Sequence, residues 1–404
     1  MSAGPAAAAL DRRALGTFAF AHACSDLCQG AVPALLAFFV LDRGYSYAEA
    51  GSLVLAASIG GSVVQPLFGL RGDRVSSPWL VPGGLLLGGL GIGLVGLAGA
   101  YPLALLAIAC SGLGVAAFHP EAARWASIAS GPRRATGLSV FSIGGNAGFA
   151  LGPLLVTPLV LVFGLHATPA LALLPLAGAV LSAGALRRLQ RGPRSASRGV
   201  AADGSAPSDA WWPFARLAAL IGLQTGLAFA LLAFVPLYLI TSAGASKVWG
   251  NAAATVLLVA GAFGTLVGGH IADRVGRRPV LAAPQLVLLP AVLALPSQGL
   301  AGAFLVLVVI GVAMDANFST ALVLGQEYLP DRIGLAAGLI LGVSVGIGGL
   351  VSAALGALAD ATSLETALYA VASFPLATLA LALTLPEPAP FATPPRSAVS
   401  SSPS

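Results

Sequence analysis

Charged side chains are scarce in this sequence. Asp, Glu, Lys and Arg together make up 9% of the 404 residues, and Lys247 is the single lysine. Soluble globular proteins carry about 25% charged residues. No stretch of this chain is polar enough to cover a water-facing surface of that kind, which excludes a string of soluble domains. The net charge of +5 rests on arginines, so their positions along the chain matter more than their sum.

Cysteine is also rare, and the three cysteines indicate neither a disulfide nor a metal site. Cys24, Cys28 and Cys110 lie in apolar runs, and we interpret them as buried small hydrophobic residues. The chain has no Walker loop, zinc-ligand spacing or nucleophile elbow. A G-x-G-x-x-G match at residues 91–96 lies in an apolar run without a βαβ setting. The sequence therefore predicts no enzyme, no catalytic residue, no cofactor and no metal site, and it argues against an ATP-driven pump.

Long apolar runs dominate what is present. Hydrophobic residues make up 57% of the chain, and the mean hydropathy is +0.91. A membrane-spanning helix needs about 20 apolar residues, and lipid leaves unpaired backbone groups unsatisfied, so the runs are expected to be helical. They do not alternate as the strands of a barrel would. The sequence predicts an all-α membrane protein with twelve transmembrane helices, at about residues 14–41, 48–70, 79–100, 102–128, 136–164, 168–186, 214–241, 249–271, 280–297, 301–326, 334–358 and 365–385.

The arginines predict the orientation of these spans. With twelve spans, eighteen of the twenty basic residues fall on the side of the N-terminus, and only Arg43 and Lys247 fall on the other side. By the positive-inside rule the arginine-rich side is cytoplasmic. The preference for Arg over Lys, with abundant Ala and Gly, is typical of a GC-rich bacterial genome. We therefore expect a multi-pass protein of the bacterial inner (plasma) membrane with both termini in the cytoplasm.

One polar segment divides the chain. Residues 187–212 are rich in Arg, Ser, Gly and Pro, which predicts a flexible cytoplasmic linker. They separate an N-terminal six-helix half, residues 1–186, from a C-terminal six-helix half, residues 213–385. The Pro- and Ser-rich residues 386–404 predict a disordered cytoplasmic tail.

The two halves carry matching loops. The Gly, Asp, Arg and Val of the loop that begins at Gly69 recur 200 positions later in the loop that begins at Gly269. Both loops resemble the Gly-x-x-x-Asp-Arg signature of the major facilitator superfamily, and a plain basic loop is the alternative. The resemblance implies two pseudo-symmetric halves around a substrate site near the midplane of the membrane. It assigns cytoplasmic gate loops to Gly69, Asp73, Arg74, Gly269, Asp273, Arg274, Arg277 and Arg278.

The predicted fifth span contains a motif of small residues. Gly148, Gly152 and Pro153 resemble the span-5 motif of the drug–proton antiporters of this superfamily. Small residues let two helices pack closely, and a proline can bend one of them. The alternative is ordinary glycine-mediated helix packing, so the motif favours an exporter without proving one.

Three further segments resemble the fosmidomycin-resistance branch of the superfamily. They are residues 22–33, 118–124 and 141–146, all in the N-terminal half. The resemblance to the superfamily covers the whole chain, and the resemblance to the branch rests on these segments.

An aspartate lies in the middle of the first span. A charge at the bilayer centre costs at least about 2.5–3.5 kcal/mol, so Asp26 is not expected to face lipid. His22 and Gln29 are four residues before it and three residues after it, on the same helix face. A carboxyl group that gains and loses a proton at this depth is what proton-coupled transport needs. The alternative is a structural hydrogen bond to another span.

The predicted fourth span carries three more ionisable residues. His119, Glu121 and Arg124 lie in its last third, and Glu121 and Arg124 can pair on one helix face. A proton relay, a cytoplasmic gate and a solvated helix end are all compatible with this pattern. We assign His119 and Glu121, with Asp26 and His22, to proton coupling, and Arg124 to the cytoplasmic gate.

Other polar residues at membrane depth are candidates for the substrate pathway. Asp315 in span 10, Asn146 in span 5 and Gln224 in span 7 join Gln29 in this group. Each of them could contact substrate or could instead link helices.

Together these features predict a proton-coupled secondary transporter. We expect an exporter of a drug or a small polar metabolite that works by alternating access. An uptake symporter for a sugar or an organic acid is the alternative, and a membrane sensor is a more remote one. The expected partners are a small-molecule substrate, protons and membrane lipid, with no nucleic acid, and the expected state is a monomer.

Overall fold

The protein is almost entirely helical in the computed structural model, which describes residues 10–59, 76–131, 133–191 and 209–386. In the N-terminal half the helices are α1 (Arg12–Arg43), α2 (Tyr47–Ile59), α4 (Leu80–Leu94), α5 (Tyr101–Ala129), α6 (Arg134–Phe163) and α7 (Leu173–Arg191). In the C-terminal half they are α8 (Trp211–Thr241), α9 (Lys247–Val275), α10 (Arg277–Ala294), α11 (Leu300–Asp315), α12 (Phe318–Tyr328), α13 (Ile333–Ala361), α14 (Leu364–Val371) and α15 (Ser373–Thr384). Within these residue ranges four 3₁₀ segments adjoin the helices, η2 (Val95–Leu97), η3 (Leu165–Ala172), η4 (Leu295–Ser297) and η5 (Pro330–Arg332).

In the described part of the chain, eleven helical segments are long and apolar enough to cross a membrane. They correspond to eleven of the twelve predicted spans. The remaining predicted span, 48–70, is described only over α2, and the rest of it lies outside the described residues. The predicted class, an all-α membrane protein of the two-half type, is confirmed.

Two of the predicted spans are interrupted helices. The span predicted at 301–326 stops as α11 at Asp315 and resumes as α12 after a turn at Ala316 and Asn317. The span predicted at 365–385 is divided into α14 and α15 at Ala372. The second interruption has a local cause, because Pro375 has no N–H to donate to the preceding turn. The first interruption places the carboxylate of Asp315 at the end of a half-helix, inside the membrane-spanning region.

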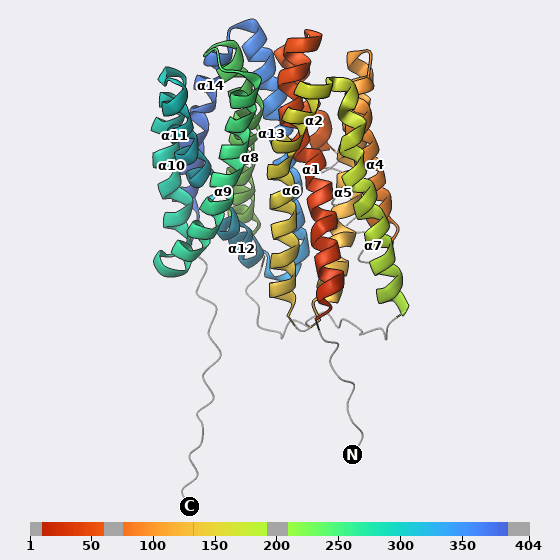
Figure 1. The fold of residues 1–404 in the computed structure, drawn as a ribbon. Helices are drawn as coiled ribbons and strands as arrows, with labels where there is room; N and C mark the ends of the chain where they lie inside the picture. Colours follow the sequence, from red (N-terminus) through yellow and green to blue (C-terminus); the bar gives the residue numbers. More distant parts are fainter. Residues whose placement is uncertain (1–9, 60–75, 132, 192–208, 387–404) are drawn as a thin grey trace, which may run out of the picture.

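The helices form two groups that lie side by side (Figure 1). In this view α1, α4, α5 and α7 lie to the right, α10 and α11 lie to the left, and α6 and α13 lie between them. Between the halves, α2 packs along α13, α6 packs along α9, and α1 contacts α8 and α9.

The hydrophobic core shows where the two halves are joined. One cluster of buried residues runs across both halves and includes Leu35 and Phe39 of α1 with Leu231 and Phe234 of α8. A second cluster, around Phe18 and Phe118, belongs to the N-terminal half alone, and a third belongs to the C-terminal half alone. The shared cluster includes the last part of α1, and the second cluster includes its first part. The halves are therefore packed together at one end of the helices and have separate cores at the other.

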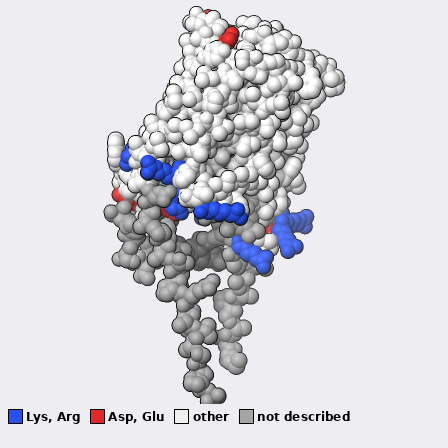
Figure 2. Space-filling model, turned by 90° about the vertical axis from the view of Figure 1, so that its left-hand side faces the viewer, with Lys and Arg blue, Asp and Glu red and all other residues white. Residues whose placement is uncertain are grey.

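Basic side chains gather at the end with separate cores (Figure 2). The blue side chains lie towards the lower part of that view, and the body above them is almost free of charge. Arg12 and Arg13 begin α1 at this end, and Arg187, Arg188 and Arg191 end α7 there. Arg43 and Lys247 lie at the opposite end, at the end of α1 and the beginning of α9.

Glycines bring α6 against α1 between these two ends. A Cβ atom at Gly148 would overlap the carbonyl oxygen of Ala23, and one at Gly152 would overlap the backbone of Gly30. Pro153 is buried next to them. The predicted motif of small residues thus lies at a contact between two helices of the same half.

Candidate functional site

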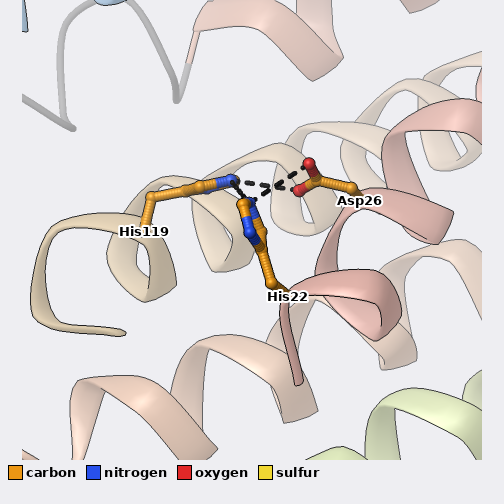
Figure 3. Close-up of side chains that lie close together, drawn as sticks. All are labelled: His22, Asp26 and His119. Carbon is orange, nitrogen blue, oxygen red and sulfur yellow. Dashed lines mark hydrogen bonds and ion pairs between the residues drawn. The ribbon is translucent and has the colours of Figure 1, made fainter. Parts of the chain in front are cut away.

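Two histidines and an aspartate meet between α1 and α5. His22 and Asp26 are one turn apart on α1, and His119 reaches them from α5 (Figure 3). The Nε2 atom of His22 lies 3.3 Å from Oδ2 of Asp26, and the Nε2 atom of His119 lies 3.0 Å from Oδ1. The two Nε2 atoms are 3.1 Å apart. We refer to His22, Asp26 and His119 as the triad.

Backbone carbonyls fix the orientation of both imidazole rings. The Nδ1 atom of His22 lies 2.8 Å from the carbonyl oxygen of Phe141, and Nδ1 of His119 lies 2.9 Å from that of Val115. A carbonyl oxygen can only accept a hydrogen bond, so each Nδ1 carries a hydrogen and donates it. In a neutral ring the Nε2 atom then has no hydrogen, and its lone pair points into the triad.

The centre of the triad therefore attracts a positive charge. Two nitrogen lone pairs and a carboxylate converge there, and these acceptors repel one another at contact distance. While neither Nε2 atom carries a hydrogen, the buried Oδ1 of Asp26, 3.0 Å from Nε2 of His119, receives no hydrogen bond from the described residues. A proton on either Nε2 would turn the repulsion into a charge-assisted hydrogen bond. A metal ion is the other species that this arrangement can hold, because one ligand atom from each residue lies within 4.8 Å of the others.

Aromatic rings and a glycine shape the pocket around the triad. The imidazole of His22 stacks on the ring of Phe141, with ring centroids 4.0 Å apart. On α6, a Cβ atom at Gly145 would lie only 2.7 Å from Oδ2 of Asp26. The side chains of His22, Asp26 and His119 retain 10%, 16% and 20% of their exposure, so the triad is enclosed but accessible to a small ion.

Glu121 lies on the same helix as His119 but has different partners. Its buried carboxylate accepts hydrogen bonds of 2.9 Å from Nε1 of Trp125 and 3.1 Å from the hydroxyl of Ser76. The guanidinium of Arg124 is 3.9 Å away. Glu121 thus links α5 to the segment before α4 near the basic end of the molecule. A proton-relay role for it stays a prediction.

A mostly apolar cleft lies between the halves, close to the triad along α1. It is lined by Gln29 and Pro33 of α1, by Phe149 of α6, by Phe229 of α8 and by residues of α2 and α13. Gln29 is three residues from Asp26, so the cleft and the triad share one face of α1. Of the four predicted pathway residues, Gln29 is the one that lines this cleft.

Two of the other predicted pathway residues lie inside the C-terminal half. Gln224 is buried in a hydrogen-bond chain in which its Nε2 donates to the carbonyl of Met314 and its Oε1 accepts from Gln285. Asp315 ends α11 against Gly261, and no described residue forms an ion pair with its carboxylate. Asn146 is exposed on α6. Contact of these residues with substrate stays a prediction.

The family model for the Major Facilitator Superfamily matches residues 18–353 of the chain. The chain belongs to the major facilitator superfamily. It is 31% identical over 369 residues to the fosmidomycin resistance protein of Escherichia coli (strain K12), and the alignment covers 90% of each chain. It is also 31% identical over 369 residues to an uncharacterised MFS-type transporter of Bacillus subtilis (strain 168), over 88% of each chain. The predicted resemblance to the superfamily and to its fosmidomycin-resistance branch is confirmed.

A solved structure of similar fold is that of a bacterial homologue of the human lysosomal transporter Spinster, in an inward-facing and occupied conformation. Its TM-score to this chain is 0.76 at 15% identity, and the match covers 91% of this chain and 95% of the other. This likeness concerns the fold alone, and the family match makes the protein a multi-pass membrane transporter.

The predicted gate loops of the transporter are described in part. Gly69, Asp73 and Arg74 lie outside the described residues, and of Asp273 only its position in α9 is described. Gly269 and Arg274 lie near the end of α9. Arg277 forms an ion pair with Glu327 of α12, and Arg278 donates to the carbonyl of Leu383. Both contacts stay within the C-terminal half.

The residues that tie the halves of the transporter together were not predicted. At the end with few basic residues, Lys247 forms an ion pair with Asp42. The carboxylate of Asp360 accepts hydrogen bonds of 2.8 and 2.7 Å from the backbone N–H groups of Tyr47 and Ala48. Nδ2 of Asn251 donates to the carbonyl of Ala34 and to the hydroxyl of Thr157. The one sequence signal for this surface was the position of Lys247, which with Arg43 lies on the side opposite the other basic residues.

Proposed function

We propose that the transporter is a proton-coupled exporter of a drug or a small polar metabolite, working as a monomer in the bacterial inner membrane. Protons enter at the triad, substrate binds in the cleft beside it, and the two halves expose the cleft to each side of the membrane in turn. The observation that carries the proposal is the convergence of Asp26, His22 and His119 around a position that calls for positive charge.

Proton exchange at the triad changes the forces inside the N-terminal half. With a proton on Nε2 of His119, the ring donates to Oδ1 of Asp26 across 3.0 Å, and α1 is held to α5 by a charge-assisted hydrogen bond. Without that proton, the same atoms repel one another. Because α1 also lines the cleft, loading and unloading the triad favours different arrangements of the cleft.

The cleft supports a role in binding amphipathic molecules. Phe149 and Phe229 offer apolar surface, and Gln29 offers a donor and an acceptor in the part nearest the triad. Pockets of this kind use a few polar groups to orient a ligand that is bound mainly by apolar contact. The relative from Escherichia coli is named for resistance to fosmidomycin, which favours export over uptake.

The arrangement of the halves supports an inward-facing state. The halves share a core and polar contacts at the end of Arg43 and Lys247, and they have separate cores at the arginine-rich end. The positive-inside rule makes the arginine-rich end cytoplasmic. One proton that moves down 100 mV releases about 2.3 kcal/mol, which sustains a substrate gradient of roughly fifty-fold.

Transport assays in everted membrane vesicles test this proposal. A pH gradient is imposed, fosmidomycin is the first probe, and wild type is compared with Asp26→Asn and with Glu365→Gln, which alters an exposed carboxylate at the start of α14. We expect the gradient to drive uptake into the vesicles for wild type and Glu365→Gln, and to drive none for Asp26→Asn. Gradient-driven flux in Asp26→Asn equal to that of wild type would refute the assignment of the proton site.

A further inference from the structure

We infer that the triad is also a binding site for a divalent transition-metal ion such as Zn²⁺. The three residues supply two imidazole nitrogens and a carboxylate from two helices that are fixed against each other. The binding itself does not depend on proton coupling, whereas its effect on transport, described below, rests on the proposed function.

The distances within the triad fit a coordination shell. Zinc binds histidine nitrogen and carboxylate oxygen at about 2.0–2.2 Å, which sets neighbouring ligand atoms about 2.9 Å apart in octahedral and about 3.3 Å apart in tetrahedral geometry. In the triad the two Nε2 atoms are 3.1 Å apart, Nε2 of His119 is 3.0 Å from Oδ1 of Asp26, and Nε2 of His22 is 3.3 Å from Oδ2, so an ion between the rings would face both carboxylate oxygens. An ion at the centre therefore needs little movement of the side chains.

The ligand atoms already have the required protonation and orientation. Both Nδ1–H groups donate to backbone carbonyls, of Phe141 and Val115, and so both Nε2 lone pairs point inwards. Metal-binding histidines are usually held in this way by an acceptor on the other ring nitrogen. The stacking of His22 on Phe141 fixes that ring further.

The composition of the triad selects the class of metal. Two imidazoles with one carboxylate favour zinc and related transition metals, whereas Mg²⁺ and Ca²⁺ prefer shells made of oxygen alone. The remaining exposure of Asp26 and His119, 16% and 20%, leaves room for water or another small ligand to complete the shell. A bound ion would occupy the position of the shared proton, so Zn²⁺ would block proton-driven transport.

Metal titration of the purified protein tests the inference. The protein carries a purification tag without histidine, and Co²⁺ is added as a spectroscopic substitute for Zn²⁺. We expect one Co²⁺ per chain, with the visible absorption of a nitrogen- and oxygen-ligated ion, and displacement of Co²⁺ by added Zn²⁺. His119→Ala and Asp26→Asn should each bind at least about tenfold more weakly.

Two variants serve as matched controls. His166→Ala and His270→Ala remove exposed histidines that lie outside the triad, and we expect both to bind Co²⁺ as wild type does. Folding of every variant is checked by gel filtration, and His119→Gln is a second variant that keeps the size of the side chain. The inference is overturned if wild type binds no Co²⁺. It is also overturned if His270→Ala loses binding while a folded His119→Gln retains it.

The vesicle assay separates the inference from the proposed function. Zn²⁺ that binds to the triad and stops gradient-driven transport supports both. Absence of binding together with normal proton coupling overturns the metal site and leaves the proposed function in place. Binding to the triad in a protein without proton coupling supports the metal site and refutes the proposed function.

Discussion

At the scale of single residues, Gly145 determines how much space the triad has. It lies on α6, opposite His22 and Asp26, where any larger side chain would reach the imidazole and the carboxylate. The position follows from the close packing of α6 on α1, which Gly148 and Gly152 also permit. Gly145 has no functional side chain, yet it determines how the side chains of the triad are arranged.

We therefore expect Gly145→Ala to impair the transporter. The added methyl group lies 2.5 Å from Cε1 of His22, and overpacking of this kind costs about 1–3 kcal/mol. Thermal unfolding in detergent and gradient-driven transport should both decline. Gly16→Ala is the control, because a Cβ atom there meets nothing within 4 Å, and the change should stabilise α1 by up to about 1 kcal/mol. Normal transport by Gly145→Ala would show that the triad tolerates a smaller pocket.

At the scale of helices, α2 receives its N-terminal cap from the other half of the molecule. The first turn of a helix has unpaired N–H groups and a partial positive charge. Asp360, near the end of α13, satisfies two of these groups, those of Tyr47 and Ala48. This cap exists only while the halves are packed together at this end, so it stabilises the conformation described here over any conformation that opens there.

We expect Asp360→Ala to shift the conformational equilibrium. Loss of a helix cap costs about 1 kcal/mol, and a change of this size alters the ratio of two states about fivefold. Spin labels on α2 and α13, measured by pulsed electron resonance, should show a larger population with a long separation at this end. Glu365→Ala, which removes a nearby exposed carboxylate, should leave the distribution unchanged. An unchanged distribution in Asp360→Ala would mean that the cap does not favour either state.

At the scale of the whole molecule, the proposed alternating access requires the two halves to move as bodies. The described ion pairs at the arginine-rich end stay within a half, as Asp11–Arg188 and Arg277–Glu327 do. The pair between Asp42 and Lys247, at the opposite end, joins one half to the other. The polar contacts therefore permit opening at the arginine-rich end and resist it at the other.

Chemical cross-linking distinguishes these two kinds of contact. We expect a bifunctional maleimide to abolish transport when it joins Asp42→Cys to Lys247→Cys, because the halves can no longer separate at that end. The control is Asp11→Cys with Arg188→Cys, which joins the N-cap of α1 to α7 within the N-terminal half and should leave transport intact. Both pairs are made with Cys110→Ser, since Cys110 is the least buried native cysteine. Full transport by the cross-linked pair at residues 42 and 247 would contradict rigid-body movement of the halves.

The sequence by itself determined the spans, the class of fold and the family of this protein. The number of apolar residues that a helix needs to cross the bilayer does not depend on its neighbours. For that reason the predicted spans agree with the helices of the described chain. Asp26 and His22 were also recognisable, because a mid-span carboxylate and a neighbour four residues away are visible along one helix.

Only the tertiary structure decided which distant side chains meet. The contact of His119 with Asp26 depends on the rotation and height of α5 against α1, and the cap on α2 depends on the packing of α13. The enclosure of Gln224 by Gln285 likewise depends on a neighbouring helix, α10. No regular spacing of residues along the sequence reveals these contacts, because they arise from the way separate helices pack together.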